Sequence, residues 1–216
     1  MKINNWLLSI SIILGVLLLV STGSISAAVV NNLVTTPTAD ITAFQRVISA
    51  EVYSGRSKRA EFVYRIDPTL ELGAILDLPA SGHSDYNLGP KAKLLLAPEA
   101  PNQPAIAAGI QNRDIYLTLS KDLTYGIRGH AGIGNGRFSN FFIGVNKVIN
   151  SGNVSIRDAA EAEEQTSSFN PPVNIMAEYV DREINLGVRT NIERHIYLEL
   201  GVLDLKDFKA GISVAF

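Results

Sequence analysis

The chain has 216 residues, a formal net charge of −2 at pH 7 and no cysteine. This length suits one domain, and the charge excludes the basic surface expected of a nucleic-acid-binding protein. The lack of cysteine excludes disulfides and a lipid-anchored amino terminus, since lipid attachment needs a cysteine at the cleavage site.

Residues 1–28 have the order of a secretory signal peptide. Lys2 supplies a positive charge, an apolar run follows from Trp6 to Val20, and small residues lead to Ala28. We expect cleavage after Ala28. The alternative is a membrane anchor, but the apolar run is short of the roughly 20 residues that a spanning helix needs. Residues 29–40 are then expected to form an N-terminal periplasmic segment, ahead of a single barrel domain at 41–216.

Most of the chain after residue 40 alternates between apolar and polar side chains, which predicts β-strands. Leu72 and Leu76, for example, alternate with Glu71 and Asp77. Turn signals separate the alternating stretches. About twelve strands are expected, near 41–53, 60–67, 69–79, 87–97, 104–111, 114–121, 124–133, 139–149, 172–180, 183–190, 195–204 and 207–216. Ten strands remain if two weaker stretches fail.

Alternation alone fits both a soluble β-sandwich and a membrane barrel. Two features favour the barrel. The expected strands approach the roughly 9–11 residues that cross a bilayer at a tilt, and the polar face is rich in glycine and in charges of both signs. We therefore predict an all-β fold, a transmembrane antiparallel up-and-down β-barrel. An even strand number places both termini on the periplasmic side.

Charged residues on the polar face of these strands are expected to face the lumen. They are Glu61, Arg65, Glu71, Asp77, Lys91, Lys93, Arg128, Glu178, Arg189 and Glu199. In a small barrel such charges either fill the interior as ion pairs or line a narrow polar conduit. We favour filling, because both signs are present.

Residues 150–172 lack the alternation. Ser155 and Asp158 are spaced to cap a short helix, and the alanines that follow are strong helix formers. We expect a solvated loop with a short helical stretch near 155–165. A plug or a partner-binding element is the alternative interpretation.

The tail from Lys209 to Phe216 resembles the closing strand of bacterial outer-membrane barrels. Lys209, Gly211, Val214 and Phe216 occupy the positions that the barrel-assembly machinery reads in such strands: a polar residue, a glycine two positions on, and hydrophobic residues third-last and last. This resemblance implies assembly in the outer membrane of a diderm bacterium. The alternative is an ordinary terminal strand of a soluble β protein.

A second resemblance begins with Asn32-Leu-Val-Thr-Thr-Pro-Thr-Ala-Asp40. This phrase resembles the opening of the YjbH-like family of outer-membrane barrel proteins, which are associated with exopolysaccharide production. The stretches 107–114 and 177–187 are also similar to that family. The resemblance implies a barrel and a link to envelope polysaccharide, and it supplies no catalytic residues.

We expect no catalytic, cofactor-binding or metal site. His83, His130 and His195 lie far apart in the sequence and lack metal-ligand spacing. Outer-membrane phospholipases place a nucleophilic serine two residues after their histidine, and Gly132 stands there after His130. His83 with Asp85 resembles the His and carboxylate pairs of outer-membrane proteases, although two residues in a Gly/Ser-rich loop are more often just a loop.

The sequence therefore predicts a small outer-membrane barrel that is structural or a narrow pore. The alternatives are an outer-membrane enzyme of lipase or protease type and a secreted soluble β-sandwich that binds a partner. Expected partners are outer-membrane lipid, the barrel-assembly machinery, and a periplasmic or polysaccharide partner.

Overall fold

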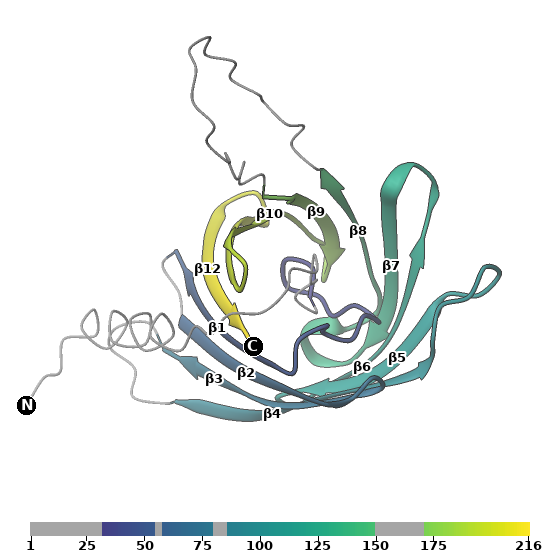
Figure 1. Ribbon diagram of the computed structural model, residues 1–216. Coiled ribbons are helices and arrows are strands. Elements are labelled where there is room, and N and C mark those ends of the chain that lie inside the picture. The colour runs from purple at the N-terminus through teal and green to yellow at the C-terminus, as the bar shows by residue number, and fades with distance from the viewer. Residues whose placement is uncertain (1–31, 55–57, 80–85, 150–170) are drawn as a thin grey trace, which may run out of the picture.

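The computed structural model of the protein describes residues 32–54, 58–79, 86–149 and 171–216 (Figure 1). The predicted signal peptide at 1–28 and the predicted helical stretch near 155–165 lie outside these residues.

The described chain forms twelve strands and two short 3₁₀ turns. The strands are β1 (Arg46–Tyr53), β2 (Lys58–Asp67), β3 (Leu70–Leu78), β4 (Asn87–Ala97), β5 (Ala105–Gln111), β6 (Asp114–Asp122), β7 (Ile127–Gly134), β8 (Phe142–Ile149), β9 (Val173–Val180), β10 (Glu183–Glu193), β11 (Ile196–Leu203) and β12 (Asp207–Ala215). The turns are η1 (Thr124–Gly126) and η2 (Gly136–Phe138). Among the described residues, no helix is long and apolar enough to span a membrane.

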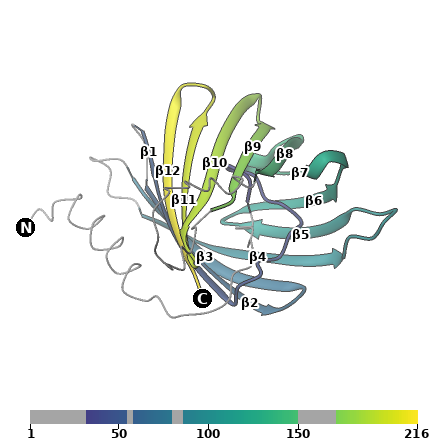
Figure 2. The same ribbon diagram turned by 45° about the horizontal axis from the view of Figure 1, so that its top comes forward.

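The strands close into a single barrel (Figures 1 and 2). Each strand pairs antiparallel with its neighbours in the chain, and β1 closes the ring by pairing antiparallel with β12, from Val47 opposite Ala215 to Tyr53 opposite Lys209. The prediction of an antiparallel barrel of about twelve strands is confirmed.

Three predicted strands start three or more residues later than expected. The strand expected at 41–53 begins at Arg46, because the preceding residues turn into the barrel. β7 begins at Ile127 rather than 124, since Tyr125 has a φ of 61° and cannot continue a strand. β8 begins at Phe142 rather than 139, after η2 and Asn140 with a φ of 74°.

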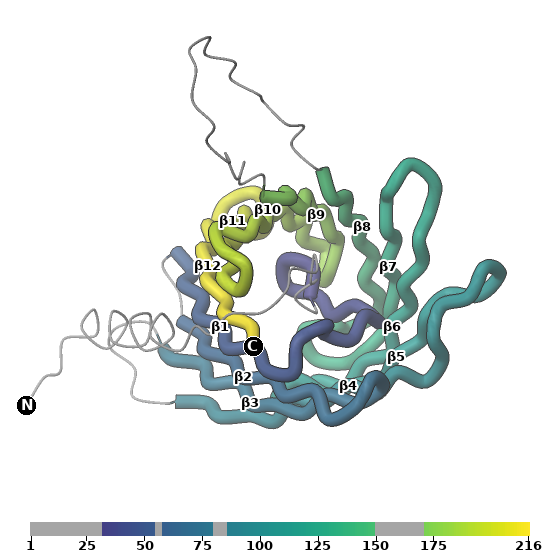
Figure 3. The backbone as a smooth tube through the Cα atoms, in the orientation of Figure 1, coloured from purple at the N-terminus to yellow at the C-terminus, as the bar shows by residue number. Residues whose placement is uncertain are grey.

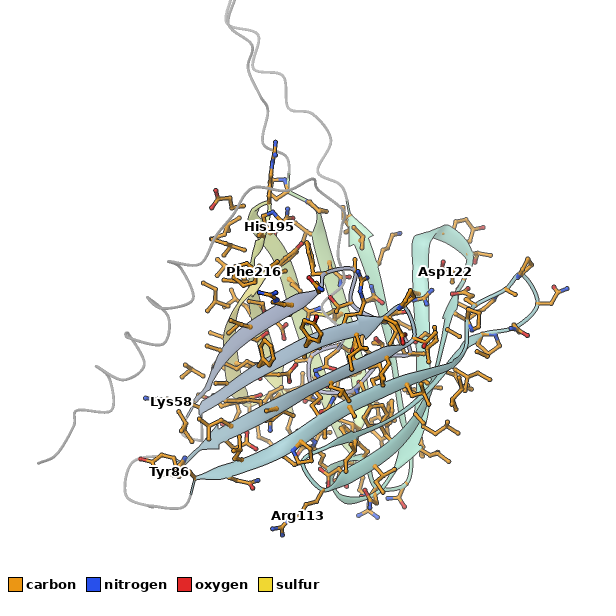
Figure 4. All side chains as sticks on the ribbon, turned by 60° about the horizontal axis from the view of Figure 1, so that its bottom comes forward. Lys58, Tyr86, Arg113, Asp122, His195 and Phe216 are labelled. Atoms are coloured by element: carbon orange, nitrogen blue, oxygen red, sulfur yellow. The ribbon has the colours of Figure 1, made fainter. Side chains whose placement is uncertain are left out.

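The two ends of the barrel hold different parts of the chain. The terminal end holds the start of β1, the end of β12 and the β10–β11 turn at His195. The far end holds the β1–β2, β3–β4 and β5–β6 connections, near Lys58, Tyr86 and Arg113 (Figure 4).

The exterior of the barrel is apolar and the interior is polar. Exposed large hydrophobic side chains alternate along the strands with buried polar ones, as where Leu198 is 37% exposed and its neighbour Glu199 8%. The exposed set includes Phe62, Leu72, Leu117, Ile143, Ile175, Leu186, Val188, Leu198 and Leu200. A soluble sandwich would bury this apolar face, so the pattern is inverted relative to that alternative.

A spin label at position 198 should test this inversion. In folded protein in lipid bilayers, we expect the label to report hydrocarbon, accessible to oxygen and inaccessible to a water-soluble paramagnetic reagent. A label at Lys206, whose side chain is 77% exposed in the β11–β12 turn, is the control and should report water. A label at 198 that reports a packed core closed to both reagents would contradict the assignment of the faces.

Candidate functional site

The barrel lumen is occupied by the chain's own N-terminal residues. The lumen segment, residues 32–44, lies within the ring of strands in Figures 1 and 3. Leu33 and Val34 are only 2% and 1% exposed. The sequence placed residues 29–40 outside the barrel as a periplasmic segment. Residues 32–40 instead lie inside it, because their main chain and side chains are matched by the barrel wall.

The lumen segment enters from the terminal end and turns back near the far end. Arg65 from β2 donates to the carbonyl of Thr42 (2.8 Å), near the terminal end. A tight turn joins the amide of Leu33 to the carbonyl of Thr36 (2.9 Å), and Asn32 pairs antiparallel with Pro37. Residues 32–37 therefore form a small hairpin with its tip at Val34 and Thr35.

Glycines in the wall make room for the two apolar side chains of the tip. A Cβ built on Gly144 of β8 would lie 2.3 Å from Leu33 Cδ1. A Cβ on Gly187 of β10 would lie 2.7 Å from Val34 Cγ2, and one on Gly201 of β11 would lie 3.1 Å from Val34 Cγ1. These three glycines of the polar face therefore make room for side chains of the lumen segment. We call these three glycines the glycine sockets.

Glu178 on β9 holds the other half of the tip. Its carboxylate accepts from the amides of Thr35 (2.8 Å) and Thr36 (3.1 Å), and from the hydroxyls of both residues. Asn185 on β10 donates a further bond to Glu178 (2.9 Å). Glu178 is 3% exposed, so these donors satisfy a carboxylate that is cut off from solvent.

Cationic side chains donate hydrogen bonds to carbonyl groups of the lumen segment. Lys209 Nζ donates to Val34 O (2.6 Å), and Arg189 Nη2 donates to Asn32 O (3.0 Å) and Leu33 O (3.2 Å). Nearer the terminal end, Lys93 donates to the carbonyl of Asp40 (2.8 Å). The amides of Thr35 and Thr36 thus meet a carboxylate, whereas the carbonyls of Asn32, Leu33, Val34 and Asp40 meet cations.

A chain of buried ion pairs lies next to the tip. It crosses the closing seam, where β1 pairs with β12. Lys209 on β12 lies 2.8 Å from Glu51 on β1 and 2.7 Å from Glu199 on β11. Arg189 on β10 lies 2.5 Å from the other oxygen of Glu199. These charges neutralise one another around Lys209, which is 3% exposed.

A second cluster surrounds Asp40 at the terminal end. Arg128 contacts Asp40 (2.6 Å), Glu99 (2.7 Å) and Asp122 (2.6 Å). Desolvation opposes ionisation of Glu99 in the β4–β5 loop, but hydrogen bonds from the Asp122 amide and from Arg128 outweigh it and lower the pKa of Glu99. Asp40 therefore anchors the segment through Arg128, which Glu99 and Asp122 also contact.

The remaining predicted lumen charges also point inward and pair across the wall. Lys91 lies 2.5 Å from Glu61 and Lys93 lies 4.0 Å from Glu71. Asp77 pairs with Arg59 (2.7 Å). The structure thus brings Glu178, Arg189 and Glu199 together at the tip, and Arg65, Glu71, Lys93 and Arg128 near the terminal end.

Sequence reasoning missed several members of the site. It assigned Lys209 only to the assembly signal, and it did not include Glu51 or Arg59 among the lumen charges. The alternation of β12 was the available signal for Lys209, since Lys209 lies on the face of the strand opposite to the apolar residues Phe208 and Ala210. No local pattern pointed to residues 32–44.

A directed hydrogen-bond chain lies beside the lumen segment. The amide of Ala39 donates to Ser120 Oγ (2.8 Å), which lies 2.8 Å from His130 Nδ1. His130 Nε2 lies 2.8 Å from Asn146 Oδ1, and Asn146 donates to Asn174 (2.9 Å). A consistent assignment has Ser120 donating to Nδ1 and Nε2–H donating to Asn146. The serine beside His130 is therefore Ser120 on the neighbouring strand β6, and not a residue two positions after the histidine.

In the part of the chain that the structure describes, no group of three or more His, Asp or Glu side chains is placed to hold a metal ion. His83 and Asp85 lie outside the described residues. His195 is buried against the ring of Phe44, with 5.7 Å between centroids.

No protein-family model matches the sequence, and no curated protein matches it. Among solved structures, the chain is similar to KdgM porin, with a TM-score of 0.50 at 12% identity, over 79% of this chain and 98% of that one. A complex of KdgM porin with disordered oligogalacturonate gives 0.49 at 12% identity, with the same coverage. The Acinetobacter baumannii outer membrane protein Omp33 gives 0.43 at 10% identity, over 80% and 98%. The likeness to KdgM porin supports a shared barrel fold.

Proposed function

We propose that this protein is an outer-membrane β-barrel whose lumen is closed by its own N-terminal segment, and that it acts as a narrow pore only when that segment leaves. The observation that carries the proposal is the occupation of the lumen by residues 32–44, with wall groups matched to the segment's main chain. The barrel fold shared with KdgM porin supports a pore rather than a solid scaffold.

The outer surface supports a membrane location. Its strands expose aliphatic side chains to the outside, and aromatic side chains stand exposed at both ends. Tyr86, Phe141 and Phe208 are 70%, 50% and 66% exposed toward the far end, and Tyr125 is 87% exposed at the terminal end. Aromatic residues at both interfaces are typical of transmembrane barrels.

The predicted assembly signal completes the proposal. Lys209, Gly211, Val214 and Phe216 would direct insertion into the outer membrane by the barrel-assembly machinery, with the terminal end on the periplasmic side. The lumen segment then enters from the periplasm. Any partner that withdraws it acts from that side.

Conductance in planar bilayers should test closure. We expect intact protein to be nearly silent. A protease site inserted beside Ala43, which is exposed, allows the segment to be cut and washed out after folding. The emptied barrel should give discrete conductance steps, and their ion selectivity should shift when Arg128 is neutralised, because charges in a narrow pore set its field.

The control for this experiment is protein without the inserted site, treated with the same protease. Frequent ion-selective channels from intact protein would contradict closure by the segment. Silence of a barrel shown by mass spectrometry to have lost the segment would contradict the pore and favour a filled interior.

A link to envelope polysaccharide is the finer part of the proposal. The phrase that resembles the YjbH-like family, Asn32–Asp40, coincides with most of the lumen segment. Removing the protein from its own cells should then lower extracellular polysaccharide, and expression of the wild-type chain should restore it. Unchanged polysaccharide output would contradict this role, but it would not contradict the proposed closed pore.

The hydrolase alternative rests on the order Ser120–His130–Asn146. In this structure Ser120 and His130 are 1% and 5% exposed, and the Ala39 amide occupies Ser120 Oγ. A substrate carbonyl has no approach to that oxygen while the segment is in place. Labelling of Ser120 by a fluorophosphonate in the emptied barrel, lost in Ser120→Ala, would favour the enzyme.

A further inference from the structure

The wall around the tip of the lumen segment has the chemistry of a peptide site. Glu178 accepts from two consecutive amides, those of Thr35 and Thr36. Lys209 and Arg189 donate to the carbonyls of Val34, Leu33 and Asn32. These acceptors and donors match the turned main chain of the tip, because every peptide unit offers one N–H and one C=O.

The same wall also distinguishes side chains. Glu178 accepts from the hydroxyls of both threonines, which valine at the same positions would not supply. The glycine sockets receive Leu33 and Val34, which cluster with Met176 and Leu203, so an aliphatic pair fits there. The wall therefore reads two aliphatic residues followed by two hydroxyl-bearing residues.

The segment's fit is also reversible in principle. Its described contacts with the wall at the tip are hydrogen bonds, ion–dipole contacts and apolar packing. The wall groups Glu178, Arg189 and Lys209 belong to strands whose pairing does not involve the segment. The site would therefore persist when the segment leaves.

We propose that the lumen wall formed by β8 to β12 is a sequence-reading peptide site, and that residues 32–37 are its built-in occupant. The site takes a polypeptide turn that carries two aliphatic residues followed by two threonines, and such a peptide replaces the segment once it has been released. The inference deepens the proposed function, and it rests on it only in taking the segment to be removable.

The test uses full-length protein folded first and then cut beside Ala43. A fluorescent peptide with the sequence of residues 32–42 is added, and its anisotropy follows binding or exchange with the cut segment. We expect saturable binding that unlabelled peptide competes away. A peptide with Thr35→Val and Thr36→Val should bind about tenfold or more weakly, because two hydrogen bonds to a buried carboxylate are lost.

Variants of the wall locate the binding. Glu178→Gln should weaken the binding of the native peptide by about tenfold or more and should largely remove the difference between the threonine and valine peptides. Asp77→Asn is the matched control. Asp77 is an inward acid paired with Arg59 and Asn112, and it should leave peptide binding unchanged. Heat-modifiable migration on a gel shows that each variant is folded.

Three outcomes overturn the peptide site. They are no saturable binding or exchange in a folded, cut barrel, equal binding of the valine peptide, and equal effects of Glu178→Gln and Asp77→Asn. The proposed function fails separately. If the peptide binds as expected while the emptied barrel conducts no ions, the peptide site stands and the pore does not.

Discussion

Replacing Lys209 by methionine should lower the free energy of unfolding by about 3–5 kcal/mol, the usual effect of removing one partner from a buried ion pair. Lys209 lies between Glu51 and Glu199 and is 3% exposed. Methionine fills a similar volume but leaves Glu51 without a cation at 2.8 Å and Val34 O without its donor. Equilibrium unfolding by urea of refolded protein in detergent micelles measures the effect.

Lys206→Met is the control for this variant. Lys206 also pairs with an acid, Asp204 at 2.5 Å, but its side chain is 77% exposed in the β11–β12 turn. Exposed pairs contribute little, so we expect a change below about 1 kcal/mol. Similar losses for the two lysines would show that burial and the ion-pair chain do not determine the stability of the seam.

Purified protein separates two roles of Lys209. The residue belongs to the predicted assembly signal, so its loss in cells would combine recognition by the assembly machinery with stability. Refolding in vitro bypasses the machinery and reports stability alone. A variant that is stable in vitro yet poorly inserted in cells would assign Lys209 to recognition.

Gly144→Ala should release the lumen segment. The added methyl would lie 2.3 Å from Leu33 Cδ1 and 3.0 Å from the carbonyl oxygen of Ala177, so the Leu33 side chain must move out of its socket. Overpacking of this kind costs about 1–3 kcal/mol, which corresponds to a roughly 5- to 150-fold rise in the released population. We expect more frequent channel openings in bilayers and faster proteolysis within residues 32–44 of the folded barrel.

Gly211→Ala is the matched control, because a Cβ there has no neighbour nearer than 3.5 Å. In protein refolded in vitro, which does not depend on the predicted assembly signal, it should leave openings and proteolysis unchanged. Adding Leu33→Ala to Gly144→Ala should recover part of the closure, since it removes the atom that the new methyl meets. A Gly144→Ala protein that stays closed and protease-resistant would mean that the glycine sockets do not hold the segment.

The barrel could be predicted from the sequence because its pattern is local. Alternation such as Leu72 and Leu76 against Glu71 and Asp77 fixes which face each strand turns inward, and turn residues fix where the strands end. The asymmetry of the two faces also indicated that the polar face lines the lumen. Boundaries were wrong where a backbone of positive φ, as at Tyr125, interrupts an otherwise regular alternation.

The lumen segment could not be predicted because its partners lie far away in the sequence. Thr35 and Glu178 are 143 residues apart, and Val34 and Lys209 are 175 apart. The wall end of each contact follows the alternation of its strand, but that alternation does not identify a partner so far away in the sequence. The excess of glycine on the polar face was the one trace, since Gly144, Gly187 and Gly201 leave room for the side chains of Leu33 and Val34, a use that the local sequence does not reveal.

The contact between Val34 and Lys209 also sets an order of events during folding. Lys209 is on β12, which pairs with β1 only when the ring closes. The binding site for residues 32–37 is therefore complete only after β12, the last strand in the chain, has paired with β1. Because closing so long a loop carries an entropic cost that only the finished wall offsets, docking of the segment reports that the barrel has closed. The time at which residues 32–44 become protected from protease then gives the time at which the barrel closes.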